Sequence, residues 1–301
     1  MLELREVHPD HAAAYRRRAI DRAVARRVGH SFEDPEQARS VVEERRERNE
    51  AHLRDYDVVD GDATVGWALW WHRGDQAELN DLDLEEPARA AELLPALVAV
   101  ARADGVRFVG AAAVPGEAAT TALVAGDGFV PRATNMALPL VDDLPDPGRL
   151  ELRPMTQEEF DAFLARATQT YVAELAASGM SEESARERGE QQMAELIPDG
   201  LDSPGQRFFR GWVRDQPVGT LWLSTERPMA FVYNVEVDEA QRRRGYGEAI
   251  MNAGARWCRD QGHPALGLNV FAHNPGARAL YDKLGYQVTS DFRSIDLDDA
   301  D

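Results

Sequence analysis

Hydrophobic and polar residues alternate from Tyr233 to Asp238, and this two-residue period predicts a β-strand. Strict alternation places Tyr233, Val235 and Val237 on one face, with Asn234, Glu236 and Asp238 on the other. Further along, apolar residues recur at intervals of three and four, which is typical of a helix that packs one stripe on a sheet. This stripe consists of Ile250, Met251, Gly254, Trp257 and Cys258.

The turn between this strand and this helix is basic and contains two glycines. Its residues are Arg242, Arg243, Arg244, Gly245, Tyr246 and Gly247. Glycine has no β-carbon, so a ligand can approach the backbone closely. The first amides of a helix lack carbonyl partners and lie at the positive end of its dipole, and guanidinium groups bind phosphate well. A solvated basic turn is the simpler interpretation of the composition, but the position at a helix start favours a diphosphate site.

Two common phosphate-binding motifs do not fit this turn. The dinucleotide fingerprint requires a third glycine where Ile250 stands, and the nucleoside-triphosphate loop requires a Gly-Lys-Ser/Thr sequence that the turn lacks. The remaining pattern is Arg-x-x-Gly-x-Gly, carried by Arg242, Gly245 and Gly247. It resembles the pyrophosphate loop of the GNAT superfamily of acyl-CoA N-acyltransferases, which reads Q/R-x-x-G-x-G/A after the fourth strand.

A second segment resembles the same family at the spacing expected there. From Leu268 to Val288 the sequence LNVFAHNPGARALYDKLGYQV has the family's Asn…Leu-Tyr…Leu-Gly-Tyr pattern. The resemblance implies a mixed α/β fold, with a mostly antiparallel sheet flanked by helices. It also implies acetyl-CoA as co-substrate and no metal ion.

The resemblance assigns roles to individual residues. In the family the fourth and fifth strands splay apart and the pantetheine arm lies between them, bonded to backbone as an added strand would be. Here Val235 and Val237 would supply those backbone groups, and the amide of Val235 would also stabilise the oxyanion. Asn274 would hydrogen-bond the pantetheine arm. Tyr281 matches the general acid that protonates the leaving thiolate, although a tyrosine that only packs is the alternative.

The general base departs from the family's patterns. Two positions that often supply it hold Asn269 and Phe231, and neither side chain can accept a proton. Glu236 is the nearest carboxylate and is our candidate, acting through water, although strict strand alternation places it on the face opposite to Tyr233 and Val235. Tyr233 and His273 are the alternatives.

An internal repeat with a constant offset of 153 residues runs through the chain. Val65-Gly66 resembles Val218-Gly219, and the residues after Ala77 resemble those after Ala230. Before this stretch, LELR also occurs twice, at residues 2–5 and 150–153, with an offset of 148 residues. The chain therefore resembles two tandem GNAT domains, at residues 1–140 and 150–301, joined by an acidic, proline-containing linker at residues 141–149.

The first copy lacks the chemistry of the second. Glu85, Glu86 and Pro87 stand where the basic turn should be, and carboxylates repel phosphate. Val124 stands where the second copy has Tyr281. We expect the first copy to have lost cofactor binding and catalysis.

Periodicity and breaker residues predict the remaining elements. In the first copy, helices are expected at residues 9–28, at 35–53 and from Pro87, and strands at 55–59 and 64–72. In the second copy, helices are expected at 157–178, at 182–196 and after Pro275, strands at 206–214, 218–225, 229–238 and 265–271, and a pair of strands closes the fold.

Composition narrows the functional class. The chain has 301 residues, a formal charge of −19 and one cysteine, so it is long enough for two domains, repels nucleic acid and cannot form an intramolecular disulfide. Cys258 is expected to be a buried structural thiol. The first residues lack the basic and apolar regions of a signal peptide, and no segment approaches the ~18 apolar residues of a membrane span, so a cytoplasmic location without membrane contact is expected.

Three functions are consistent with these features. The first is acetyl-CoA-dependent N-acetylation of a primary amine on a small molecule or a peptide or protein N-terminus. The second is a mycothiol-synthase-like acetyltransferase, since that family also has two GNAT copies with one active. The third is a non-catalytic acyl-CoA sensor, which would have no need for Tyr281. A monomer that forms an internal pseudo-dimer, or a homodimer, is expected.

Overall fold

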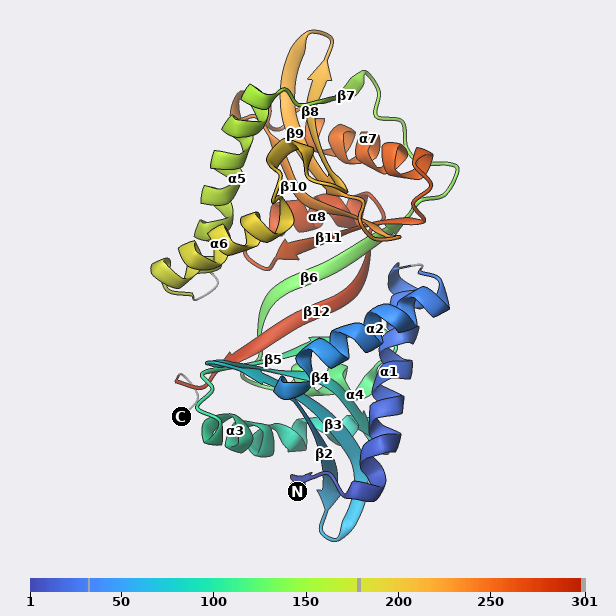
Figure 1. Ribbon diagram of the computed structural model, residues 1–301, viewed down its shortest axis with the longest axis vertical. Coiled ribbons are helices and arrows are strands. Elements are labelled where there is room, and N and C mark those ends of the chain that lie inside the picture. The colour runs from blue at the N-terminus through green and yellow to red at the C-terminus, as the bar shows by residue number, and fades with distance from the viewer. Residues whose placement is uncertain (32, 178–179, 299–301) are drawn as a thin grey trace. The chain divides into compact units, whose positions relative to one another are not determined.

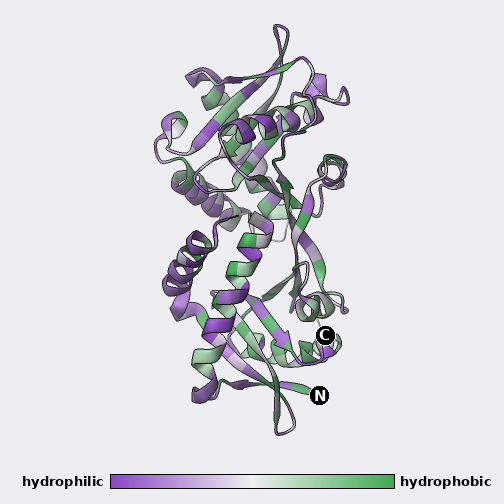
Figure 2. Ribbon diagram, turned by 90° about the vertical axis from the view of Figure 1, so that its right-hand side faces the viewer, coloured by the Kyte–Doolittle hydropathy of each residue, from purple (hydrophilic) through white to green (hydrophobic). Residues whose placement is uncertain are grey.

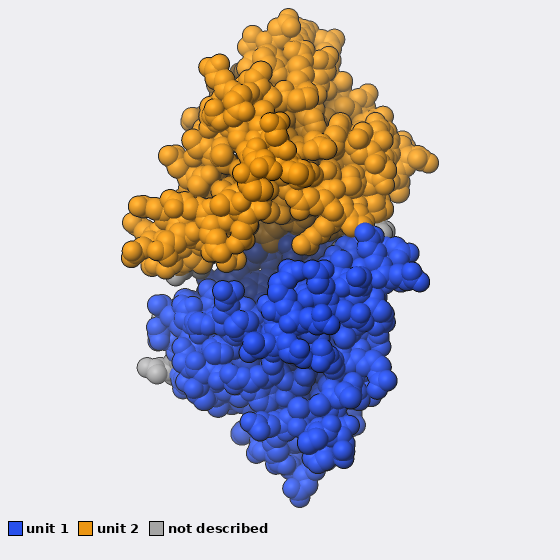
Figure 3. All heavy atoms as spheres, viewed as in Figure 1, with its two compact units in different colours: residues 1–135, 288–301 blue, residues 136–287 orange. Residues whose placement is uncertain are grey.

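The computed structural model describes residues 1–31, 33–177 and 180–298 and divides the chain into two compact units. Unit 1 comprises Met1–Asn135 with Val288–Asp301, and unit 2 comprises Met136–Gln287 (Figure 3). The sequence predicts two domains separated by a linker at residues 141–149. The two units differ from those domains, because Val288–Asp301 belongs to unit 1. Residues 141–149 themselves lie in unit 2, where Arg256 donates to the carbonyl of Leu144 at 2.8 Å.

Unit 1 combines a sheet with helices (Figure 1). Its helices are α1 (Pro9–Ser31), α2 (Pro35–Asn49), α3 (Leu94–Ala103) and α4 (Ala118–Val124), with 3-10 turns η1 (Glu50–His52) and η2 (Pro87–Leu93). Its strands are β1 (Leu2–Glu6), β2 (Leu53–Asp60), β3 (Ala63–Arg73), β4 (Gln76–Leu84), β5 (Phe108–Ala113), the start of β6 (Val130–Pro139) and β12 (Gln287–Asp296). They lie in the order β1-β2-β3-β4-β5-β12-β6.

Unit 2 repeats this plan. Its helices are α5 (Gln157–Ala177), α6 (Glu182–Leu196), α7 (Tyr246–Asp260) and α8 (Pro275–Lys283), with 3-10 turns η3 (Gly200–Asp202) and η4 (Glu239–Gln241). Its strands are β7 (Leu150–Pro154), β8 (Gln206–Val213), β9 (Gln216–Ser224), β10 (Ala230–Val237) and β11 (Ala265–Phe271), with the end of β6 beside β11. The order is β6-β11-β10-β9-β8-β7, so each unit has a mixed, mostly antiparallel sheet.

Equivalent backbone contacts confirm the duplication. A β-carbon added at Gly66 would lie 2.2 Å from the carbonyl oxygen of Asp83, and one added at Gly219 would lie 2.2 Å from that of Glu236. At the end of the same strand pair, the amide of Glu85 donates to Val65 at 2.9 Å in unit 1. The amide of Asp238 donates to Val218 at 3.0 Å in unit 2. All four pairs of equivalent positions keep the offset of 153 residues seen in the sequence.

The sheet of unit 2 is packed on both faces. On one face, Trp222 contacts Phe163 of α5 and Phe208 with ring centroids 6.3 and 5.3 Å apart. On the other, α7 buries Ile250, Met251, Gly254 and Cys258, as its apolar stripe predicts. Burial raises the pKa of the Cys258 thiol to about 12, which suits a structural thiol rather than a nucleophile.

Figure 2 shows hydrophilic and hydrophobic residues mixed along the same helices, as expected for helices with one packed face. Within the ranges that the structure describes, no helix combines the length and apolarity needed to cross a bilayer.

Several details differ from the sequence expectations. The helix expected at residues 35–53 ends at Asn49 as α2, because η1 follows it and Leu53 already belongs to β2. The closing pair of strands is a single long strand, β12, whose residues 291–296 pair with β5. The helix expected from Pro87 begins as the 3-10 turn η2, and α3 follows it. The helix expected to reach Ser178 is described as far as Ala177, and Ser178 itself lies outside the described residues.

The alternation expected in β10 is wrong at Tyr233. The pairing with β9 shifts register between Val232 and Asn234, so Tyr233 is the extra residue of a β-bulge. Its ring lies 4.8 Å from that of Trp222. Thr220 lies two residues before Trp222 on β9, so these two side chains point to the same face of the sheet. Glu236 pairs with Thr220, and directly opposed side chains also share a face. Tyr233 therefore shares a face with Glu236 and not, as expected, with Val235.

Candidate functional site

The sheet of unit 2 opens between β10 and β11. These two strands are parallel and pair only from Ala230 with Leu266 to Val232 with Leu268. Beyond the bulge at Tyr233, β10 continues its pairing with β9 as far as Val237. The second half of β10 therefore has a partner on one side, and its other edge faces an interruption in the sheet.

The backbone of β10 points hydrogen-bond donors into this interruption. The amide of Asp238 donates to Val218 of β9 at 3.0 Å. Amides alternate between the two edges of a strand, so that of Glu236 also faces β9. The amides of Val235 and Val237 then face the open edge. These are the two strand residues that the sequence resemblance selected for the pantetheine arm.

The basic turn leads directly from β10 into the start of α7. Gly245 has φ +82° and is the N-cap residue of the helix. A β-carbon there would meet nothing within 4 Å, so the left-handed backbone, and not a lack of space, requires glycine. At Gly247 a β-carbon would approach Leu280 at 3.4 Å and Val237 at 3.6 Å. Helix α7 thus begins beside both β10 and α8.

The three arginines of the turn are exposed. The Nε atom of Arg242 donates to the carbonyl of Val237 at 3.2 Å, and a terminal nitrogen lies 3.9 Å from Glu236. Arg243 adopts φ +60°, an uncommon backbone conformation for a residue with a side chain. The free amides of α7 and these guanidinium groups together make the start of the helix strongly attractive to anions.

Helix α8 and the residue that caps it supply two of the predicted site residues. Asn274 caps the helix, because its Oδ1 atom accepts from the amide of Ala277 at 3.1 Å, which leaves its side-chain nitrogen as the donor for a ligand. Tyr281 is 6% exposed. Burial, followed by the negative charge of Glu174, raises the pKa of Tyr281 to about 12, so its hydroxyl stays protonated at neutral pH.

Glu174 is a candidate that the sequence reasoning missed. It lies on α5, is half-buried, and interacts electrostatically with Tyr281 and His273. In the sequence it is one of many acidic residues in helical segments. Only the packing of α5 brings it to the residues of α8 and of the loop after β11.

The predicted base Glu236 and its alternatives lie in different surroundings. Glu236 is on the α5 face of the sheet, 3.9 Å from Arg242. His273 stacks on Phe271 with ring centroids 5.4 Å apart. Burial raises the pKa of Tyr233, whose ring packs on Trp222 and Phe231.

In unit 1 the equivalent interruption is filled. Strands β4 and β5 pair in parallel only from Gln76 to Leu79 of β4. Arg22 and Arg26 of α1 donate to the carbonyls of Leu82 and Asn80 beyond that point, each at 3.3 Å. Both guanidinium groups also pair with Asp81, which is 2% exposed. Side chains of α1 therefore occupy the free backbone edge of β4. The equivalent edge of β10 in unit 2 is open.

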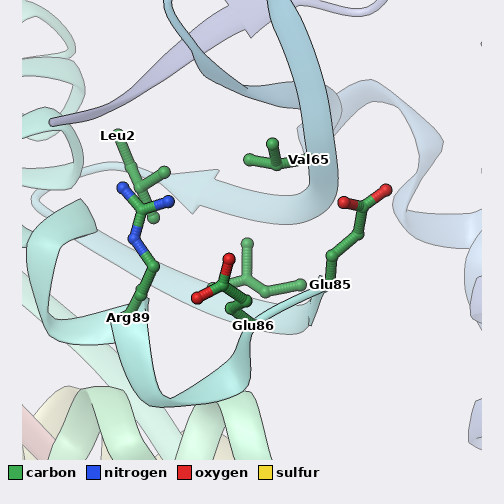
Figure 4. A pocket seen from close by; sticks show the side chains of 6 residues that line it. Leu2, Val65, Glu85, Glu86 and Arg89 are labelled. Carbon is green, nitrogen blue, oxygen red and sulfur yellow. The ribbon is translucent and has the colours of Figure 1, made fainter.

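The turn after β4 also differs from the turn after β10. A small pocket there is lined by Glu85, Glu86 and Arg89, among others (Figure 4). Arg89 is already paired with Asp60 and with Glu92, at 2.9 Å each. By the 153-residue offset, Glu85 and Glu86 correspond to Asp238 and Glu239, and Arg89 corresponds to Arg242, so the expectation that carboxylates replace the arginines is wrong. The turn of unit 1 instead lacks the glycine, because Glu92 stands where unit 2 has Gly245.

Among the described residues, no three or more His, Cys, Asp or Glu side chains are grouped so that they could hold a metal ion.

Comparisons with known proteins identify relatives of this chain. The model of the acetyltransferase (GNAT) family matches residues 168–286. The N-acetyltransferase YdgE of Bacillus subtilis is 35% identical over 146 residues, which cover 46% of this chain and 92% of YdgE. YycN of the same organism is 33% identical over 144 residues, with coverage of 46% and 92%. The structure of a GCN5-related N-acetyltransferase from Sphaerobacter thermophilus covers 97% of this chain and 95% of its own, with 18% identity and a TM-score of 0.56.

The similarity to YdgE and YycN, over nearly their whole length, defines the class of protein as N-acetyltransferase. The chain belongs to the acetyltransferase (GNAT) family, whose members use acyl-CoA. The full-length structural match shows a shared fold across both units.

Proposed function

We propose that unit 2 transfers the acetyl group of acetyl-CoA to a primary amine of a small molecule or a protein N-terminus by direct attack. The observation that carries this proposal is the interruption between β10 and β11, with the basic start of α7 at its end. An elongated thioester with a diphosphate at one end matches both features. Backbone donors along a strand edge suit the pantetheine arm, and helix amides with arginines suit the diphosphate.

In this proposal the binding groups are distributed along the interruption. Val235 and Val237 hydrogen-bond the pantetheine arm, and the amide of Val235 also donates to the thioester oxygen as that oxygen gains negative charge. Asn274 donates to the arm from the other side. The diphosphate is held at the start of α7 by a set comprising Arg242, Arg243, Arg244, Gly245, Tyr246 and Gly247.

The reaction requires one bond to form and one to break. The neutral amine nitrogen attacks the thioester carbon, the carbon–nitrogen bond forms, and the carbon–sulfur bond breaks. The departing sulfur takes the hydroxyl proton of Tyr281, whose raised pKa keeps that proton in place at neutral pH until the thiolate forms. The attacking nitrogen loses one proton, and an equivalent proton returns from solvent to the oxygen of Tyr281. The products are an N-acetylated amine and free CoA thiol.

Residues 1–140 take no part in cofactor binding in this proposal. Two observations support this: the arginine side chains that occupy the open edge of β4, and Glu92 in the place of the glycine that caps α7. Residues 150–301 then carry the catalysis.

The test combines binding with turnover. Isothermal titration with acetyl-CoA should give one site per chain. Release of CoA thiol should then be measured against a panel of primary alkylamines, arylalkylamines and peptides with free N-termini. Binding at one site with amine-dependent thiol release supports the enzyme. Binding without release for every amine would instead support a non-catalytic acyl-CoA sensor, and two sites per chain would contradict the role given to unit 1.

A further inference from the structure

Tyr233 is the exposed aromatic side chain of β10. Among the phenylalanine, tyrosine and tryptophan residues that the structure describes, only Tyr233 is exposed, at 37%. Its ring is nevertheless packed, because its centroid lies 4.8 Å from that of Trp222 and 5.3 Å from that of Phe231. A ring that is packed on its neighbours and still open to solvent can bind a flat apolar group with little loss of side-chain freedom.

The ring of Trp222, on which Tyr233 packs, is held by a chain of hydrogen bonds. The Nε1 atom of Trp222 donates to the side-chain oxygen of Gln206 at 2.8 Å, and the side-chain nitrogen of Gln206 donates to Glu226 at 2.9 Å. Trp222 and Gln206 are each 2% exposed. Because a turn of the Trp222 ring would leave buried polar groups unpaired, this ring is a rigid support for Tyr233.

The repeat in unit 1 shows that the fold does not require an aromatic residue at this position. The pairing of β3 with β4 shifts register between Leu69 and Trp70, which leaves Asn80 as the extra residue of a β-bulge. Asn80 precedes Tyr233 by 153 residues, so both units have this bulge at equivalent positions. In unit 1 the bulge residue is an asparagine, whose carbonyl accepts from Arg26 at 3.3 Å. The aromatic side chain is therefore particular to the unit whose strand edge is open.

Tyr233 lies where the sheet of unit 2 opens. Val232 with Leu268 is the last pair between β10 and β11, and Tyr233 follows it directly. Two residues further along β10 is Val235, whose amide faces the open edge, and two residues of a strand span about 6.6 Å. Helix α7 packs on the opposite face of the sheet, so an acceptor reaches a thioester at Val235 from the face that carries Tyr233.

We propose that the ring of Tyr233 binds an aromatic ring of the acceptor, so that the preferred acceptor is a primary amine with such a ring close to its nitrogen. This inference rests on the proposed acetyl transfer. The nitrogen attacks the thioester held at Val235 while the ring of the acceptor lies against Tyr233. The bonds made and broken are those of the acetyl transfer, and Tyr233 takes no part in moving protons.

The test removes the ring from the acceptor and from the full-length protein in turn. The acceptors are 2-phenylethylamine and ethylamine, which differ by the ring alone. The unaltered protein should favour 2-phenylethylamine in kcat/KM by roughly 10- to 100-fold, the usual effect of burying an aromatic ring in a matching site. Tyr233→Ala should lower this preference about tenfold, because the loss falls on the amine that has the ring. Tyr233→Phe keeps the ring and should keep the preference, as should Asn80→Ala at the equivalent bulge of unit 1.

The ratio between the two amines is a readout that a purely structural role would not change, because a poorly folded variant loses activity equally on both. Tyr233→Leu keeps apolar packing on Trp222 without a flat ring, so it should also lose preference and covers the case of a poorly folded alanine variant. The peptides Phe-Gly-Gly and Gly-Gly-Gly, compared in the same way, show whether the ring belongs to a small amine or to a peptide N-terminus. An unaltered protein without preference for the ring, or a preference that survives in Tyr233→Ala and Tyr233→Leu, would overturn the assignment. If the unaltered protein acetylates no amine, the proposed function fails instead.

Discussion

The guanidinium of Arg26 lies 2.8 Å from the carboxylate of Asp81, which is 2% exposed, in the interruption between β4 and β5 of unit 1. Arg26 also pairs with Glu117 at the start of α4 and donates to the carbonyl of Asn80. One side chain therefore joins α1, β4 and α4.

Removal of Arg26 should destabilise the protein. Arg26→Met leaves Asp81 and Glu117 with less neutralising charge in a buried place, and breaking such a pair from one side costs about 3–5 kcal/mol. Urea unfolding followed by fluorescence measures this free energy. The control is Arg39→Met, which breaks an ion pair with Asp21 between half-exposed side chains and should cost much less, because solvent screens that pair. Equal costs for the two variants would show that the buried network does not stabilise unit 1.

Gly245 should be required for cofactor binding more than for stability. Gly245→Ala meets no neighbouring atom but strains a residue at φ +82°, which costs about 1–2 kcal/mol and turns the first amides of α7 away from the diphosphate. Acetyl-CoA affinity should fall about tenfold, equivalent to ~1.4 kcal/mol. Gly262 is the matched control, because it also has space around it and φ +87° but follows the other end of α7. Calorimetry should find that Gly262→Ala loses stability and keeps its affinity.

Tyr281 and Tyr286 provide a second matched pair. Their rings lie 5.7 Å apart and both are buried. Tyr281→Phe should lower kcat by roughly ten- to a thousandfold with little change in acetyl-CoA affinity, since only the donated proton is lost. The Tyr286 hydroxyl is buried, and within the described part of the chain it makes no hydrogen bond. Tyr286→Phe should therefore keep its activity and be as stable as the unaltered protein or more so. A kcat that Tyr281→Phe leaves unchanged would remove Tyr281 from the mechanism.

The two sequence repeats should not fold well when separated at the linker. A fragment of residues 150–301 lacks β6 and carries β12 without β5, with which residues 291–296 pair. Unpaired strands expose backbone groups and apolar side chains, so the fragment should aggregate or dimerise. Size-exclusion chromatography and circular dichroism would detect this. A fragment that is monomeric, stable and fully active would show that the first repeat is dispensable.

The sequence predicts local structure well where periodicity determines it. The helix at residues 182–196 and the strand at 265–271 agree with α6 and β11 at both ends. The bulge at Tyr233 could not be predicted in this way, because it depends on how β10 pairs with β9. The alternating pattern of β10 does not show that one of its residues has no partner in β9.

Features that depend on distant residues were not predictable from one sequence. Arg22 and Arg26 are two of many arginines in a polar helix, and their contact with Asp81 arises only when α1 packs on β4. Glu174 is similar, since its interaction with Tyr281 joins residues more than a hundred positions apart. The glycine-rich turn, by contrast, is contiguous, and its position between a strand and a helix could be read directly.

The placement of β12 has a consequence for synthesis on the ribosome. All of the residues of unit 2, up to Gln287, are made before Val288, whereas unit 1 needs Val288 and the rest of β12 to cover the edge of β5. The half of the protein that is made first is therefore the half that is finished last. Until the final residues emerge, β5 is an exposed edge strand, open to pairing with other nascent chains.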